Sequence, residues 1–114
     1  MKNVEKQMKI DDSISVICQE MGLSYDYAKC PNRKREVVDT RHLIARILKD
    51  QYDLSAAEIA PHINRSRSNT VISLRNSKAW VKINKTFREK YTRVKTALEN
   101  HFKQKDLESA LPQF

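Results

Sequence analysis

Glycine occurs only once in these 114 residues, at Gly22, and proline only three times. Tight hairpin turns and β-bulges need positive-φ conformations that glycine adopts most readily, so a fold of many short strands is disfavoured. Helices joined by short polar connections need far less glycine. A single glycine also cannot form the glycine-rich loops that hold nucleotide phosphates in P-loop and dinucleotide-binding proteins. The sequence therefore predicts an all-α fold without a nucleotide site of that kind.

The charge of the chain is strongly basic and unevenly distributed. Lys and Arg number 22 against 14 Asp and Glu, and the net charge of +8 suits a polyanion, either nucleic acid or an anionic membrane surface. No acid occurs between Ile59 and Arg88, and a second basic cluster runs from Lys29 to Lys49. A solvated helix face would normally mix the two signs, because like charges four residues apart repel on a helix. We therefore expect a polyanionic partner.

Apolar periodicity and capping residues predict a single small helical bundle at residues 11–103, between a flexible basic lead at 1–10 and a loose tail at 104–114. In the first half we expect a helix capped by Asp11-Asp12-Ser13 and stopped by Gly22, a short turn of helix near Tyr25, and a long helix at 36–51. A helix at 56–60 follows, with the capping box Ser55-x-x-Glu58, then a turn at 61–64 and a helix from Ser66 or Ser68 to about Trp80. The closing helix has an apolar stripe of Phe87, Tyr91, Val94, Leu98 and Phe102.

The segment from Leu54 to Leu74 has the organisation of a helix-turn-helix at the centre of the bundle. Its second helix begins with polar residues of types that read DNA bases in the major groove, since Arg pairs with guanine, Asn with adenine, and the Thr methyl meets that of thymine. These residues are Arg67, Ser68, Asn69 and Thr70. We expect Val71, Ile72, Leu74 and Trp80 to face inward. The alternative interpretation, a capped corner of an ordinary bundle, stays open at this point.

Several motifs occur together at long range: Arg33-x-Arg35-x-Val37, Arg41-His42, Leu54-Ser55-x-x-Glu58-Ile59 with Ile63, Thr70-Val71 and the stripe from Phe87. With this spacing, the chain from about Ile14 to Asn100 resembles the C-terminal DNA-binding domain of the bacterial replication initiator DnaA. The resemblance implies a helical bundle related to the Trp repressor. It also implies that the partner is double-stranded DNA.

The resemblance assigns roles to individual positions. Arg33, with Arg35 beside it, stands where the family inserts an arginine into the minor groove, whose negative potential is greatest where it is narrow. Arg41 stands where the family contacts a phosphate, and Thr70 stands at a position that contacts bases or backbone. We expect further contacts to the DNA backbone from Lys34, His42, Arg65, Arg75 and Lys78.

The chain also departs from the family pattern. Arg67, Ser68 and Asn69 replace the Asp, His and first Thr of its signature, so we expect a different target sequence. Asn64 and Arg65 replace the two glycines of the family's turn, and Ser66 replaces an arginine. The family carries an ATPase domain upstream, whereas these 114 residues contain no Walker motif, so we expect no ATPase activity from them.

These observations predict a sequence-preferring binder of double-stranded DNA in replication initiation or its control, at a replication origin, in the bacterial cytoplasm or nucleoid. Other replication proteins are candidate partners. Two alternatives remain open: a transcription regulator of the same fold, and an interaction module for an acidic protein. An enzyme is not predicted, because His42, His62 and His101 lack metal-ligand spacing. We expect no cofactor, no small-molecule substrate and, since the apolar stretches are short, no membrane span.

Overall fold

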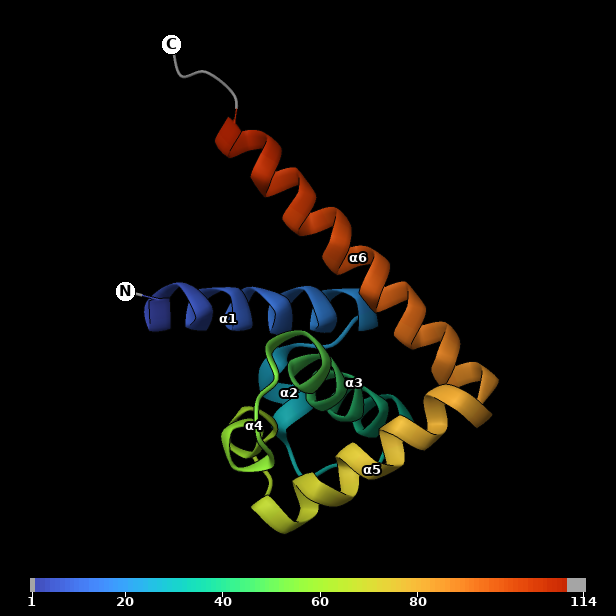
Figure 1. Ribbon diagram of the computed structural model, residues 1–114. Helices are drawn as coiled ribbons and strands as arrows, with labels where there is room; N and C mark the ends of the chain where they lie inside the picture. The colour runs from blue at the N-terminus through green and yellow to red at the C-terminus, as the bar shows by residue number, and fades with distance from the viewer. Residues whose placement is uncertain (1, 111–114) are drawn as a thin grey trace.

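The computed structural model of the chain describes residues 2–110, which form six helices and no strand. The all-α prediction is confirmed. The helices are α1 (Lys2–Met21), α2 (Tyr25–Lys29), α3 (Arg35–Tyr52), α4 (Ala56–Ile63), α5 (Arg67–Ile83) and α6 (Lys85–Ala110). In Figure 1, α1 and α6 lie against each other on one side of α3, whereas α4 and α5 lie on the other side. Among residues 2–110, no helix is both long and apolar enough to cross a bilayer.

The core is built around α3, which is buried along most of its length. Ile17 from α1, Ile59 from α4 and Leu98 from α6 join its apolar side chains in one cluster. The apolar stripe expected on the closing helix is confirmed as core: Phe87, Val94 and Leu98 are buried, and Tyr91 and Phe102 pack against the cluster. Burying each large apolar side chain contributes about 1.5–3 kcal/mol, so the core holds all the helices around α3.

The first helix begins earlier than the sequence predicts. We expected residues 1–10 to be a flexible lead, but the structure is helical from Lys2, and Ile10 is buried in the core. Asp11-Asp12-Ser13 therefore lies inside α1 and caps nothing. Ser13 Oγ instead hydrogen-bonds the hydroxyl of Tyr52, at 2.7 Å. Apolar residues recur at helical spacing from Ile10 onward, so one face of α1 is buried continuously. The helix therefore continues through these polar residues.

The last helix also extends beyond its predicted end. We expected a loose tail at 104–114, but α6 continues to Ala110, and residues 111–114 lie outside the described residues. On this final stretch, Lys105 Nζ bonds the carboxylate of Asp12 on α1. The extension therefore includes a contact between helices that are distant in sequence, which periodicity alone does not reveal.

Local capping signals locate the remaining boundaries well. Gly22 follows α1 with φ +73°, and α3 lies within one residue of its predicted range. The capping box is confirmed, since Ser55 N donates to Glu58 Oε1 at 3.0 Å and Glu58 N donates to Ser55 Oγ at 3.2 Å. Two helices end later than predicted: α5 runs to Ile83 and not to about Trp80, and α4 continues through Pro61 to the fully buried Ile63. The helix forgoes one backbone hydrogen bond at the proline and gains burial of Ile63.

Candidate nucleic-acid interface

Helices α4 and α5 are joined by a turn of three residues, Asn64 to Ser66. Asn64 adopts a left-handed conformation with φ 53°, and its backbone N–H bonds the carbonyls of Ala60 and Pro61. Ser66 then caps α5, because its Oγ accepts a hydrogen bond from the backbone N–H of Asn69 at 3.1 Å. This short, capped turn packs the two helices together, in the arrangement expected of a helix-turn-helix.

The turn is also tied to the first half of the chain. Asn64 Nδ2 donates to the carbonyl of Lys29 at 3.3 Å, and the Tyr25 hydroxyl donates to the carbonyl of His62 at 2.6 Å. Both bonds join α2 to the α4–α5 corner. Segments about 35 residues apart in sequence are thereby held beside each other.

The first turn of α5 presents polar side chains to solvent. Arg67, Ser68 and Asn69, three of the four residues predicted to read bases, are all exposed. The N-terminal end of a helix has unpaired backbone N–H groups and a partial positive charge, both of which favour an anion nearby. No acidic residue occurs anywhere in α5. This end of the helix is therefore suited to approach phosphates and base edges.

Thr70, the fourth predicted reader, faces the opposite way. Its side chain is fully buried, and its Oγ1 donates to the carbonyl of Ser66 at 2.8 Å. Thr70 lies two turns before the buried Ser77, on the inner face of α5. The structure therefore does not support the predicted direct contact of Thr70 with DNA. Thr70 instead fixes the first turn of the helix.

Two apolar residues of α5 face outward, against expectation. Val71 and Ile72 were predicted to be core residues, yet they are 46% and 44% exposed. Leu74 and Trp80 do pack against the core, as predicted. Residues spaced three or four apart share a helix face, so the face of Thr70, Leu74 and Ser77 leaves Ile72 on the other side.

The basic loop before α3 lies on the same side of the molecule as the exposed face of α5. Arg33, Lys34 and Arg35 are exposed, with Arg35 beginning α3. An open hollow of about 310 Å³ lies between this loop and α5. Its lining includes Arg33 from the loop and Asn69 from the first turn of α5; the other lining residues are Val38, Arg41, His42, Arg65, Ile72 and Ser73. Two segments predicted to contact one ligand are thus neighbours.

Arg41 is largely withdrawn from this surface. It is 5% exposed, and its guanidinium donates to the carbonyls of Ala28, Cys30 and Asn32 at 3.2, 2.8 and 2.9 Å. Burial lowers the pKa of Arg41, and the charge of Arg65 lowers it further. The structure therefore does not support the predicted phosphate contact. Arg41 instead holds the loop that presents Arg33.

His42 is also mostly buried, at 8% exposure, and packs edge-on against Trp80 with 4.8 Å between ring centroids. Burial lowers the pKa of His42, so its ring is neutral near pH 7. Among the described residues, its Nδ1 has no hydrogen-bond partner. These contacts indicate a packing role between α3 and α5 in place of the predicted contact with the DNA backbone.

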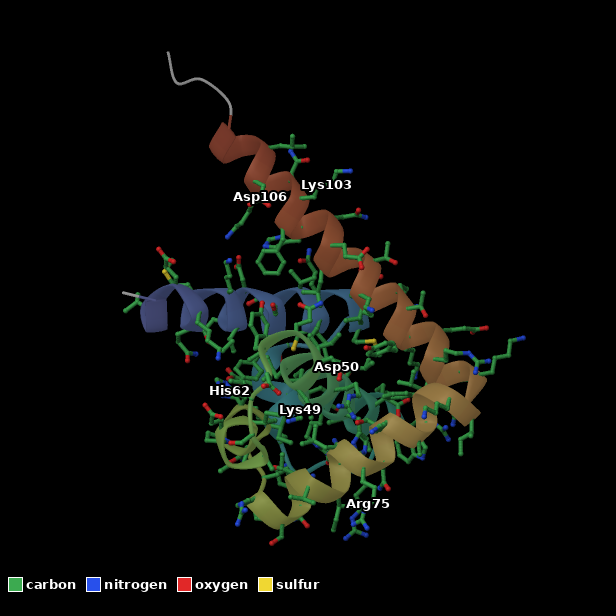
Figure 2. All side chains as sticks on the ribbon, viewed as in Figure 1. Lys49, Asp50, His62, Arg75, Lys103 and Asp106 are labelled. Carbon is green, nitrogen blue, oxygen red and sulfur yellow. The ribbon has the colours of Figure 1, made fainter. Side chains whose placement is uncertain are left out.

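The other predicted backbone contacts are accessible. Lys34, Arg75 and Lys78 are exposed, and Arg65 is half-buried at the turn. Figure 2 shows Arg75 pointing away from the body of the molecule on α5. Their contacts with the DNA backbone stay a prediction.

One residue that positions the site was not recognised from the sequence. Arg46 was counted only as part of a basic cluster, yet it is buried and bonds both carboxylate oxygens of Asp50. Its Nη1 also donates to the carbonyl of Leu74 at 2.9 Å, which attaches α5 to α3. The spacing of Arg46 and Asp50 by four residues is a sequence signal for the ion pair, but not for the bond to α5.

These features define a class of protein: a small all-α domain in which a helix-turn-helix lies beside an exposed basic loop. No family model matches the chain. Three curated relatives do, and each is a chromosomal replication initiator protein DnaA. The similarity to DnaA expected from the sequence motifs is therefore confirmed.

The matches cover most of this chain and a small part of each relative. Identity is 26% over 98 residues with the protein of Bacteroides thetaiotaomicron, covering 85% of this chain and 21% of that protein. It is 28% over 95 residues with that of Bacteroides fragilis, covering 82% and 20%. It is 32% over 70 residues with that of Ureaplasma parvum, covering 61% and 15%. The chain thus spans 15–21% of the length of these proteins, which is the share of a single domain.

Proposed function

We propose that this chain binds double-stranded DNA with a preference for sequence, placing the first turn of α5 in the major groove and Arg33 in the adjacent minor groove. One observation carries the proposal: Arg33 and Asn69 line the same hollow. A loop and a helix end that open onto one surface can contact a single duplex together. The protein is, in this proposal, a binding module and not an enzyme.

The exposed residues make three kinds of contact with DNA. Arg67, Ser68 and Asn69 contact base edges, where Arg pairs with guanine and Asn with adenine through two hydrogen bonds each. Arg33 and Arg35 enter the minor groove, which attracts them most strongly where it is narrow. The phosphate contacts come from Lys34, Arg65, Arg75 and Lys78, which position the protein without reading sequence. Because Arg67 replaces an acid of the family signature, the preferred site differs from that of the family.

Buried residues act on this surface indirectly. Arg41 holds the loop of Arg33 through three carbonyls, and Thr70 bonds the carbonyl of the capping residue Ser66. His42 fills the space between α3 and Trp80. In this proposal they are positioning residues that contact no part of the DNA.

The relatives' name suggests the process. All three are called chromosomal replication initiator proteins, so we place this chain in replication initiation or its control, with binding at a replication origin. Other replication proteins are its candidate partners, and the bacterial cytoplasm or nucleoid is its expected location. ATP hydrolysis is not part of the proposal, since Gly22 is the only glycine of the chain.

Selection of duplexes from a random pool, followed by sequencing, tests the proposal. We expect a defined consensus and an affinity that falls steeply with salt, because bound cations release counterions from the phosphates. If about five phosphates are neutralised, the slope of log K against log salt is roughly −4.5. Binding weaker than about 100 μM to every duplex, even at low salt, would contradict the proposal and favour an acidic protein partner.

Two arginines of α5 provide a matched pair for this experiment. Arg67→Ala should cost about 1–3 kcal/mol on the selected site and relax the consensus at one position. Arg75→Ala should weaken binding to all duplexes alike and reduce the salt slope by about 1. Equal effects of the two substitutions on the consensus would contradict the assignment of Arg67 to a base. Circular dichroism of both variants controls for folding.

A further inference from the structure

An apolar residue occupies the middle of the polar face that α5 turns to solvent. Ile72 follows Ser68 by four residues and precedes Arg75 by three, so the three side chains share one face of the helix. Ile72 remains 44% exposed, whereas most large apolar residues of the central helices are buried. The hollow between α5 and the basic loop places Ile72 beside Arg33 and Asn69.

The surroundings of Ile72 indicate what covers it. The stretch from Ile59 to Arg88 contains no acid, and the exposed neighbours Arg67 and Arg75 are cations. A polyanion therefore matches the charge of this face. The partner must also offer an apolar group at the centre of the contact, because covering Ile72 with polar groups alone would leave them desolvated.

The major groove of DNA meets both requirements. Its rims are phosphates, and each thymine exposes a C5-methyl group on its floor. We propose that Ile72 is a specificity-determining residue that packs against the C5-methyl group of a thymine in the bound site. This inference rests on the proposed DNA-binding function. It assigns to the exposed Ile72 the thymine contact that the sequence suggested for Thr70, which is buried.

The size of the effect follows from the area of one methyl group. Burying one methyl group changes an equilibrium constant about fourfold, and more if a second thymine is contacted. A contact of this kind distinguishes thymine from uracil and, at a C·G pair, 5-methylcytosine from cytosine. Hydrogen bonds to base edges do not make either distinction, because the pairing groups are the same.

The test uses the full chain and the site obtained by selection. Each thymine of that site is replaced in turn by deoxyuridine, which removes only the methyl group, and the dissociation constant is measured for each duplex. For the unaltered protein we expect one position at which affinity falls about fourfold. Replacing that base pair by one containing 5-methylcytosine should retain more affinity than the same pair with cytosine.

Ile72→Ala should remove the penalty at that position, so that this variant binds the thymine and deoxyuridine duplexes equally well. Ile83→Ala is the matched control: Ile83 lies at the other end of α5 and is 79% exposed. Both substitutions replace an exposed helical isoleucine by a better helix former, so neither should unfold the chain. Ile83→Ala should keep the full deoxyuridine penalty.

The outcomes separate this inference from the function on which it rests. If selection gives no preferred duplex, both are overturned. If it gives a consensus but no deoxyuridine substitution weakens binding, or if the penalty persists in Ile72→Ala, the proposed function stands and the role of Ile72 is wrong. Equal loss of the penalty in Ile83→Ala would also contradict a local contact at Ile72.

Discussion

Arg41 illustrates how a single buried cation organises an exposed one. Its guanidinium satisfies three carbonyls at the end of α2 and in the following loop, and this loop presents Arg33. The planar guanidinium donates in several fixed directions, which a lysine cannot reproduce. We therefore expect substitution of Arg41 to lower the stability of the fold, and substitution of Arg33 to weaken DNA binding with little effect on stability.

Arg41→Met should lower the free energy of unfolding by about 1–3 kcal/mol, because it leaves buried carbonyls without donors. Denaturant titration followed by circular dichroism measures this loss. Arg33→Ala is the control: it should change stability by less than about 0.5 kcal/mol, since Arg33 is exposed, while it weakens DNA binding. A stable Arg41→Met variant would show that the three carbonyls are satisfied by water.

His42 makes the stability of the fold depend on pH. Because burial lowers its pKa in the folded state, the unfolded chain takes up a proton at a higher pH than the folded chain does. Stability should therefore fall as pH decreases below about 6.5, by at most about 1.4 kcal/mol per pH unit for one proton. The pKa values of Asp12 and Glu58 are lowered by their hydrogen-bond partners, so protonation of these two acids affects stability only at more acidic pH.

Denaturant titrations between pH 5 and 7.5 test this prediction. His42→Gln keeps a polar side chain but removes the titrating group, so its stability should change less with pH than that of the unaltered protein. The same slope in both proteins would assign the pH dependence to another group.

At the scale of elements, the α4–α5 corner depends on caps at both sides of a three-residue turn. Asn64 closes α4 and Ser66 opens α5, and the hydroxyl of Ser66 pairs a backbone N–H of the first turn. That first turn carries all three exposed residues proposed to read bases. A frayed first turn would therefore affect stability and recognition together.

Ser66→Ala should lower the free energy of unfolding by about 1 kcal/mol, since it removes the N-cap hydrogen bond. Ser68→Ala is the matched control, because Ser68 is exposed and makes no capping bond, and it should leave stability nearly unchanged. Thermal and denaturant unfolding measure both. Similar losses in the two variants would show that the cap contributes little.

At the scale of the whole molecule, long-range polar contacts join helices at opposite ends of the sequence. Lys90 Nζ bonds the buried carboxylate of Asp39 at 2.7 Å and so connects α6 to α3. Asp12 on α1 pairs with His101, at 3.1 Å, and with Lys105, both on α6. In Figure 1, α1 lies above α3, and α6 runs diagonally past the C-terminal end of α1.

Asp12→Asn should destabilise the protein near neutral pH. Hydrogen bonds from Lys105 and His101 lower the pKa of Asp12, so the folded state gains stability above the ordinary pKa of the carboxyl and loses it as pH falls through the lowered value. The effect should be modest, up to about 1 kcal/mol, because the group is partly exposed and screened. The difference between the two proteins should vanish in strong acid, as denaturant titration at several pH values would show.

The positions of the helices and the basic character of the surface can be predicted from local patterns in the chain. Gly22, the capping box of Ser55 and Glu58, and the stripe from Phe87 to Phe102 act over a few residues each, so their effects can be predicted without knowing what packs nearby. The acid-free stretch from Ile59 to Arg88 is likewise a property of the chain itself. The helix-turn-helix and its exposed Arg67, Ser68 and Asn69 follow from such local signals.

The burial of individual polar residues and the exposure of individual apolar residues depend instead on how the helices pack against each other. Arg41 and Thr70 turned out to be buried, and Ile72 exposed, because each depends on which face of its helix meets another helix. The start of α1 and the end of α6 were extended through burial of Ile10 and the bond of Lys105 to Asp12. Exposure is set by contacts between segments distant in sequence, and no local pattern encodes those contacts.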